Sequence, residues 1–292
     1  MQLYDPAHSQ KIPSRGNLKK RGIFIMTKKA KVVKSEVYAA YGIEYKAGKI
    51  YHPVFGWINP LLVDGNTKLG KGVWTWSMLP TNKEFTIAVN GTVYTERGTC
   101  PCHCEGCYAT TGNYRFSSVI KSLMIKTWLA RHDMEFVKNA IKAQIIADHI
   151  RLLRIHAAGD FFSADYIAMW SNIVEFANNT VFWTYTKNAS AESAFDGFSN
   201  ANIVKSCIPG IGFNFGHCDY IIMAYKALKA AGKNVYICRC GIDNNQHCTN
   251  CHGCAESEYV LFVEHSTGYE ASADPAYAEL VDLINSQPRK EF

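Results

Sequence analysis

The chain contains 292 residues, of which 48% are hydrophobic and 19% charged, and it carries a formal net charge of +6. This composition is ordinary for a soluble globular protein, and at this length about three quarters of the unfolded surface can be buried. No apolar run reaches the roughly 18 residues of a membrane span, and no cleavable leader opens the chain. We therefore expect a cytoplasmic protein without a membrane partner.

Positive charge is concentrated near the start of the chain. Nine basic residues and no acidic residue lie between Lys11 and Lys34. Such a segment can neutralise phosphates and so favours a nucleic acid partner, although a solvated leader has the same composition. We assign residues 1–35 as a basic N-terminal arm and residues 36–292 as a single α/β domain.

The apolar pattern predicts alternating strands and helices along most of this domain. Asn90-Gly91 indicates a hairpin turn within 84–94, and two helices follow at 118–131 and 134–150. Further strands are expected at 152–156, 181–186, 202–208, 235–238 and 259–264, and further helices after Ser163, at 220–231 and at 275–286. This alternation implies parallel pairing through crossover helices, hence a βα barrel or an open doubly wound sheet.

The cysteines are clustered in two short segments. Nine of the eleven lie within residues 100–107 or 238–254. In a reducing cytosol, thiols at such close spacings hold a metal more readily than they form disulfides. Cys207 and Cys218 stand apart in apolar contexts, and we expect both to be core residues.

The first segment predicts an iron-sulfur site. Cys100, Cys104 and Cys107 have the spacing C-x3-C-x2-C. Three thiolates can bind three irons of a [4Fe-4S] cluster, which leaves the fourth iron open to a small molecule. A zinc site completed by Cys102 or His103 is the alternative.

The second segment predicts a metal centre that is closed by the protein. Cys240, Cys248, Cys251 and Cys254 have the spacing C-x7-C-x2-C-x2-C, and Cys238 is a fifth candidate ligand. Four thiolates would satisfy every iron of a second [4Fe-4S] cluster, which suits electron relay or structural support. A structural zinc held by four cysteines is the alternative.

Polar residues at the ends of two predicted strands are the candidate catalytic groups. His156 and Asp160 follow one strand, and Tyr185 and Lys187 end the next. Ligand sites of α/β folds gather at the carboxyl ends of parallel strands. Asp160 could accept hydrogen bonds from an ammonium group, whereas His156 could equally be a buried histidine that is hydrogen-bonded for structure.

The residues around the first segment resemble the cluster loop of the radical S-adenosylmethionine (SAM) superfamily. The resemblance rests on Thr-Cys-Pro-Cys-His-Cys-Glu-Gly-Cys-Tyr-Ala at 99–109 and on a strand that ends in Ala-Ala-Gly-Asp at 157–160. That superfamily usually has an aromatic residue where this chain has Gly106, and a Gly-Gly-Glu-like motif at the strand end. The resemblance implies a partial (β/α) barrel with mainly parallel strands, to which an N-terminal extension and a C-terminal cysteine-rich loop are added here.

The same resemblance implies a set of cofactors and contacts. Two [4Fe-4S] clusters would be present, the first would bind SAM, and an electron donor such as flavodoxin or ferredoxin would reduce them. Gly159, Asp160 and Tyr108 would contact SAM. Gly210 and Gly212 could bring the backbone close to an adenine or carboxylate group, although such glycine spacing alone is weak evidence.

A narrower resemblance covers about two thirds of the chain. The runs at 76–80, 99–109, 156–166 and 182–187, together with the late cysteines, are similar to a phage family named gene product eighty-eight. This family has no agreed function to carry over. It implies that the protein is encoded by a phage or mobile element and acts in the cytoplasm of the host cell.

Three functional hypotheses follow from these patterns. The first is an iron-sulfur enzyme that cleaves SAM and starts radical chemistry on an unknown substrate, with nucleic acid among the candidates. The second is a zinc-stabilised nucleic-acid-binding protein whose basic arm contacts phosphates. The third is an iron-sulfur enzyme that does not use SAM.

Overall fold

The computed structural model describes residues 32–65, 69–102, 107–242, 247–251, 253–264 and 270–288. The chain divides into two compact units, Met1–Val32 and Val33–Phe292, and every element below belongs to the second. The predicted basic arm therefore falls almost wholly outside the described residues. None of the helices described is both long and apolar enough to cross a lipid bilayer.

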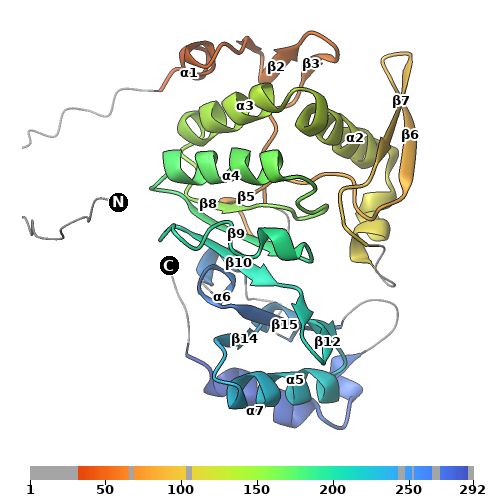
Figure 1. Cartoon of the computed structure of the whole chain (residues 1–292), viewed down its shortest axis with the longest axis vertical. Coiled ribbons are helices and arrows are strands. Elements are labelled where there is room, and N and C mark those ends of the chain that lie inside the picture. The colour runs from red at the N-terminus through yellow and green to blue at the C-terminus, as the bar shows by residue number, and fades with distance from the viewer. Residues whose placement is uncertain are drawn as a thin grey trace, which may run out of the picture. The chain divides into compact units, whose positions relative to one another are not determined.

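The largest sheet has five strands in the order β10-β9-β8-β5-β4 (Figure 1). Strands β5, β8, β9 and β10 pair in parallel, and β4 pairs with β5 in the antiparallel sense. The strands are β4 (Val63–Asp64), β5 (Val73–Thr75), β8 (Leu152–Arg154), β9 (Val181–Thr186) and β10 (Ala201–Lys205). The four parallel strands follow one another in chain order across the sheet.

Helices cover one face of this sheet, as the arrangement of α3 and α4 beside β8 in Figure 1 illustrates. They are α2 (Ser117–His132), α3 (Met134–Ala147) and α4 (Ala164–Phe176). Leu153, Phe182 and Ile203 of the sheet share one buried cluster with Ile141 of α3 and Trp170 of α4. This cluster is the main hydrophobic core.

The opposite face of the sheet is covered by the late cysteine segment. Because side chains alternate along a strand, the neighbours of the core-facing residues point the other way. Leu152 and Trp183 pack with Cys248 and Cys254, and Val204 packs with Cys254 and Cys251. The sheet therefore separates a helical layer from a cysteine-rich layer.

Shorter elements precede and interrupt the large sheet. The N-terminal elements are α1 (Lys34–Ala40) and a sheet of β1 (Tyr45–Lys46), β2 (Lys49–His52) and β3 (Gly56–Ile58). The hairpin of β6 (Glu84–Val89) and β7 (Thr92–Arg97) leads into the first cysteine segment. Short 3-10 helices η1 (Tyr108–Thr110) and η2 (Gly112–Arg115) follow that segment.

The C-terminal part forms a second core around a small parallel sheet of order β13-β15-β14. Its strands are β13 (Phe215–Gly216), β14 (Val235–Ile237) and β15 (Tyr259–Val263), and a hairpin of β11 (Cys207–Ile208) and β12 (Gly212–Phe213) precedes them. Its helices are α5 (Cys218–Ala230), α6 (Gly253–Glu256) and α7 (Tyr277–Ser286). The remaining 3-10 helices are η3 (Ala189–Ala191), η4 (Arg239–Gly241), η5 (Cys248–Asn250) and η6 (Ala271–Ala273).

The predicted elements from residue 84 onward are confirmed, with small differences at their ends. The strand expected at 202–208 is divided into β10, which pairs in parallel with β9, and β11, which pairs in the antiparallel sense with β12. The expectation that Cys207 is a core residue is wrong, since it is exposed, whereas Cys218 is fully buried. The described strands form no closed barrel, and the partial barrel stays a prediction.

Candidate functional site

The first cysteine group consists of the four cysteines within residues 100–107, of which Cys104 lies outside the described residues. The N–H of Cys100 donates to the carbonyl of Thr81 at 2.9 Å, which fixes the start of the group. Burial raises the pKa of the Cys100 thiol to about 12, and the negative charges of Asp160 and Cys107 also raise it. Cys100 and Cys107 therefore lie near each other.

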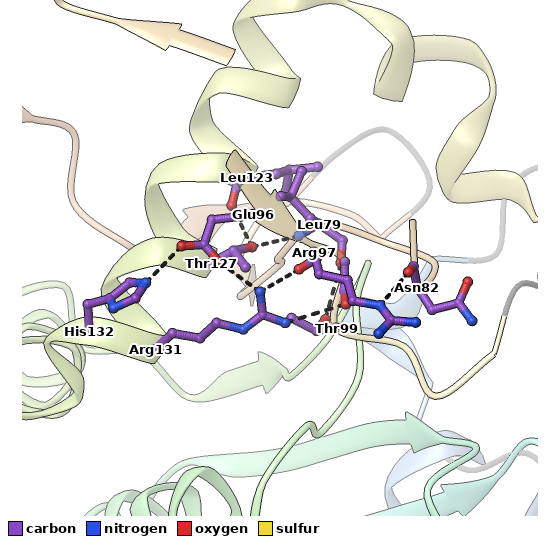
Figure 2. A network of polar contacts seen from close by, with 10 residues as sticks. Leu79, Asn82, Glu96, Arg97, Thr99, Leu123, Thr127, Arg131 and His132 are labelled. Carbon is purple, nitrogen blue, oxygen red and sulfur yellow. Dashed lines mark hydrogen bonds and ion pairs between the residues drawn. The ribbon is translucent and has the colours of Figure 1, made fainter. Parts of the chain in front are cut away.

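A polar network holds the backbone that leads to Cys100 (Figure 2). Arg131 of α2 pairs with the buried Glu96 at 2.7 Å and donates to the carbonyl of Arg97 at 2.6 Å. His132 contacts the other Glu96 oxygen at 2.8 Å. Breaking a largely buried pair of this kind is costly, so α2 fixes the end of β7 just before the cysteines.

The loop after β8 packs on the residue that precedes Cys100. The N–H of Asp160 donates to the hydroxyl of Thr99 at 3.0 Å. Gly159 has φ +86°, and a Cβ placed on it would lie 2.6 Å from Thr99 Oγ1 and 3.1 Å from Met78 Cβ. Glycine is the residue that allows both this backbone conformation and this approach.

The Asp160 carboxylate is occupied by groups of the chain itself. Its Oδ1 accepts hydrogen bonds from the N–H of Phe161 at 2.7 Å and from the hydroxyl of Thr186 at 2.6 Å, and its Oδ2 accepts one from the N–H of Lys187 at 2.8 Å. Burial raises the pKa of Asp160, and these hydrogen bonds oppose the shift. Asp160 thus ties the loop after β8 to the end of β9, and its contact with SAM stays a prediction.

Lys187 connects this loop with the β11–β12 hairpin. Its ammonium lies 5.7 Å from the ring centroid of Phe213, and its charge opposes the raised pKa of Cys100. Gly210, with φ of +73°, lies in the turn of that hairpin, and Gly212, with φ of +135°, begins β12 and pairs with Ile208. The contact of both glycines with a cofactor stays a prediction.

His156 is a packed core residue. Its Nε2 lies 2.9 Å from Tyr166 Oη, its Nδ1 lies 3.4 Å from Thr184 Oγ1, and its ring meets Phe161 edge-on. Burial, together with the charge of Arg154, lowers its pKa to about 3. These contacts account for His156 without a ligand, so the structure favours the structural alternative over a catalytic role.

The second cysteine group is defined as Cys238, Cys240, Cys248, Cys251 and Cys254. A hydrogen bond with Cys238, together with burial and the charge of Cys251, raises the pKa of the Cys240 thiol to about 12, although a hydrogen bond with Cys248 opposes the shift. Burial and the charges of Cys248 and Cys251 raise the pKa of Cys254, although its hydrogen bond with a tyrosine opposes the shift. The five thiols are therefore neighbours.

The chemistry of this group fits a soft metal. Thiolates select zinc and iron-sulfur clusters, and buried thiols must lose their protons when a metal binds. Within the described ranges, no three His, Cys, Asp or Glu side chains are already placed to hold an ion. The donor type and the proximity of the thiols, rather than a finished coordination geometry, are what make the group a candidate metal centre.

The loop of the second group is anchored from both sides. The N–H of Thr249 donates to the carbonyl of Leu69 at 3.2 Å, and the N–H of Cys238 donates to that of Leu261 at 2.8 Å. A Cβ on Gly253 would lie 2.4 Å from the ring of Tyr236, so glycine lets the loop approach this ring.

Arg154 lies at the junction of the two cysteine groups. Its Nη2 donates to the hydroxyl of Tyr108, the residue after Cys107, at 3.3 Å. Its guanidinium carbon lies 4.8 Å from the ring centroid of Tyr185, whose hydroxyl donates to Cys254 Sγ at 2.6 Å. Burial disfavours the charge of Arg154, but the neighbouring tyrosines and thiols outweigh burial and raise its pKa.

Sequence reasoning found Tyr185 and Tyr108 but missed Arg154. The alternation of side chains along β8 could have identified it, because Arg154 stands two residues after Leu152 and therefore lies on the same face of the sheet as Leu152. Of the two residues expected at the end of β9, Tyr185 contacts Cys254 of the second cysteine group, and the charge of Lys187 acts on Cys100 of the first.

Part of the chain that carries this site matches a known protein family. The model of the family "Gene product 88" matches residues 60–206, just over half of the chain, from β4 to the end of β10. The chain belongs to the gene product 88 family. The match includes the first cysteine group and Arg154 and ends before the second cysteine group.

Two relatives from phages share part of this region. The gene 88 protein of Mycobacterium phage D29 is 27% identical over 82 residues, and that of Mycobacterium phage L5 is 26% identical over 82 residues. Each alignment covers 25% of this chain and 34% of the relative, so the chain spans about a third of the length of the relatives it matches. No solved structure matches the chain.

We expect Gly159→Ala to destabilise the protein more than Gly91→Ala does. Both glycines have a positive φ, but a Cβ on Gly91 meets nothing within 4 Å. The contact with Thr99 should cost Gly159→Ala about 2 kcal/mol beyond the cost of the backbone conformation. Denaturant unfolding measures both variants; equal losses of free energy would contradict the close packing of this loop on Thr99.

We expect His156 to make the protein acid-labile. Its pKa is about 3 when folded and 6.5 when exposed, so its contribution to stability is complete above pH 6.5 and falls as the pH drops below that value. His156→Asn should reduce the slope of unfolding free energy below pH 6 by about 1.4 kcal/mol per pH unit. The control is His149→Asn at an exposed position with a similar φ of 52°, which should keep the slope; the same slope in both variants would contradict the buried neutral state of His156.

Proposed function

We propose that this protein is an iron-sulfur enzyme resembling radical SAM proteins, with a cluster at each cysteine group. The observation that carries the proposal is that Arg154, on the face of the sheet that the second group covers, contacts Tyr108 next to the first group and Tyr185 next to the second. The order of β5, β8, β9 and β10 across the sheet also supports it, because a partial barrel has its strands in chain order.

The first group is the proposed site of chemistry. Such a cluster, when bound, supplies one electron to SAM and so starts radical chemistry on a substrate. The chain's own residues would fix the cluster loop through Arg131 and Glu96 and hold Asp160 in place through the end of β9. The helices on the far face of the sheet would close that side of the site to water.

The second group is the proposed relay or structural centre. It offers five half-buried thiols where four saturate a cluster. As partners we propose an electron donor such as flavodoxin or ferredoxin and a nucleic acid substrate, the latter supported by the basic segment before residue 35. The site of action would be the cytoplasm of the host cell.

Metal analysis tests this function. After anaerobic reconstitution we expect about eight irons and eight sulfides per chain, and about half of each in Cys107→Ser and in a Cys251→Ser/Cys254→Ser double variant, which leaves only three thiols at the second group. Cys207→Ser, outside both groups, is the control and should keep the full content. Stoichiometric zinc without visible charge-transfer absorbance would contradict the proposal and favour a zinc-stabilised protein that binds nucleic acid.

SAM binding separates the proposal from an iron-sulfur enzyme that does not use SAM. Equilibrium dialysis with the reconstituted protein should detect bound SAM, and Cys107→Ser should abolish the binding while iron remains at the second group. If Cys107→Ser binds SAM as well as the wild type does, SAM does not bind at the first group. If the wild type binds no SAM, the protein is an iron-sulfur enzyme that does not use SAM.

A further inference from the structure

The Nε of Arg154 is a hydrogen-bond donor that no described residue uses. This nitrogen atom is also buried. A buried N–H of a charged group without a partner costs free energy, so a partner is expected when the site is complete. Arg154 lies on the face of the sheet that the second cysteine group covers.

The surroundings of Arg154 are rich in groups that become negative when a metal binds. Cys248 and Cys254 both interact electrostatically with its guanidinium, and Tyr185 lies between the guanidinium and the Cys254 thiol. Four thiolates around a divalent ion have a net charge of about −2, which is costly to bury without a nearby cation. Lys205 of the neighbouring strand β10 is already paired with Glu258 and Glu192.

The guanidinium also reaches the first cysteine group. Its Nη2 donates to Tyr108 at 3.3 Å, and Tyr108 also donates its hydroxyl to the carbonyl of Ala157 in the loop after β8. Tyr108 directly follows Cys107 and begins the short helix η1. One side chain thus borders both groups.

We propose that Arg154 is the counter-charge of the metal centre at the second cysteine group, and that the same guanidinium positions Tyr108 beside the first. This inference rests on the proposed function only in requiring that the second group holds a metal. It does not depend on iron or on SAM. Arg154 is a positioning residue, because it acts through the thiolates and Tyr108.

Cadmium titration tests the proposal on the full-length chain. The metal-free protein in the Cys107→Ser background is titrated with Cd²⁺, and binding is followed by thiolate-to-cadmium absorbance. Arg154→Gln should weaken cadmium binding about tenfold, because one nearby positive charge is lost in a poorly solvated site. Arg151→Gln, which removes an exposed charge just before the same strand, should bind like the parent.

The lysine variant separates charge from packing. Arg154→Lys keeps the positive charge, so its cadmium affinity should stay within about threefold of the parent. Thermal unfolding of the metal-free variants shows whether each one folds. If Arg154→Gln does not fold, the cadmium affinity of Arg154→Lys decides the test. Parental affinity in a folded Arg154→Gln, or a tenfold loss in a folded Arg154→Lys, would overturn the proposal.

Failure of the role proposed for Arg154 can be told apart from failure of the proposed enzyme function. If the natural protein contains zinc rather than iron, the enzyme proposal fails while the cadmium result still decides the role of Arg154. If the protein contains iron and Arg154→Gln binds cadmium like the parent, the role of Arg154 fails alone.

Discussion

The alternation of side chains across the parallel sheet is the constraint on which the site depends. Leu153 and Phe182 point to the helices and enter the main core, so their neighbours Arg154 and Trp183 must point to the opposite face. That face needs a cover, and the loop of the second cysteine group provides it. A segment about 50 residues beyond β10 is thereby brought onto the sheet near Arg154.

The polar contacts around the site make this arrangement rigid before any ligand enters. Glu96 and Arg131 fix the approach to the first cysteines, and Asp160 joins the loop after β8 to the end of β9. Each contact satisfies a buried charge with groups that come from distant parts of the sequence. The Nε of Arg154 differs, because it is buried and no described residue accepts a hydrogen bond from it.

The sequence predicted the parts of the molecule that depend on local pattern. Cysteine spacing located both groups, and Ser163 marked the start of α4, where its hydroxyl accepts from the N–H of Tyr166. It could not predict β5, which has three residues and is held by β8 across a long interval of chain. Nor could it decide the role of His156, because that role follows from burial against Tyr166 and Phe161 rather than from its place at a strand end.

The central claim is that two iron-sulfur centres lie on either side of the Arg154 guanidinium, on the face of the sheet opposite α3 and α4. Anomalous diffraction at the iron and zinc absorption edges, from anaerobically grown crystals, tests it most directly. The account predicts two iron positions, one among the cysteines of each group, with Arg154 between them. Zinc at these positions, or an iron position away from Arg154, would contradict it.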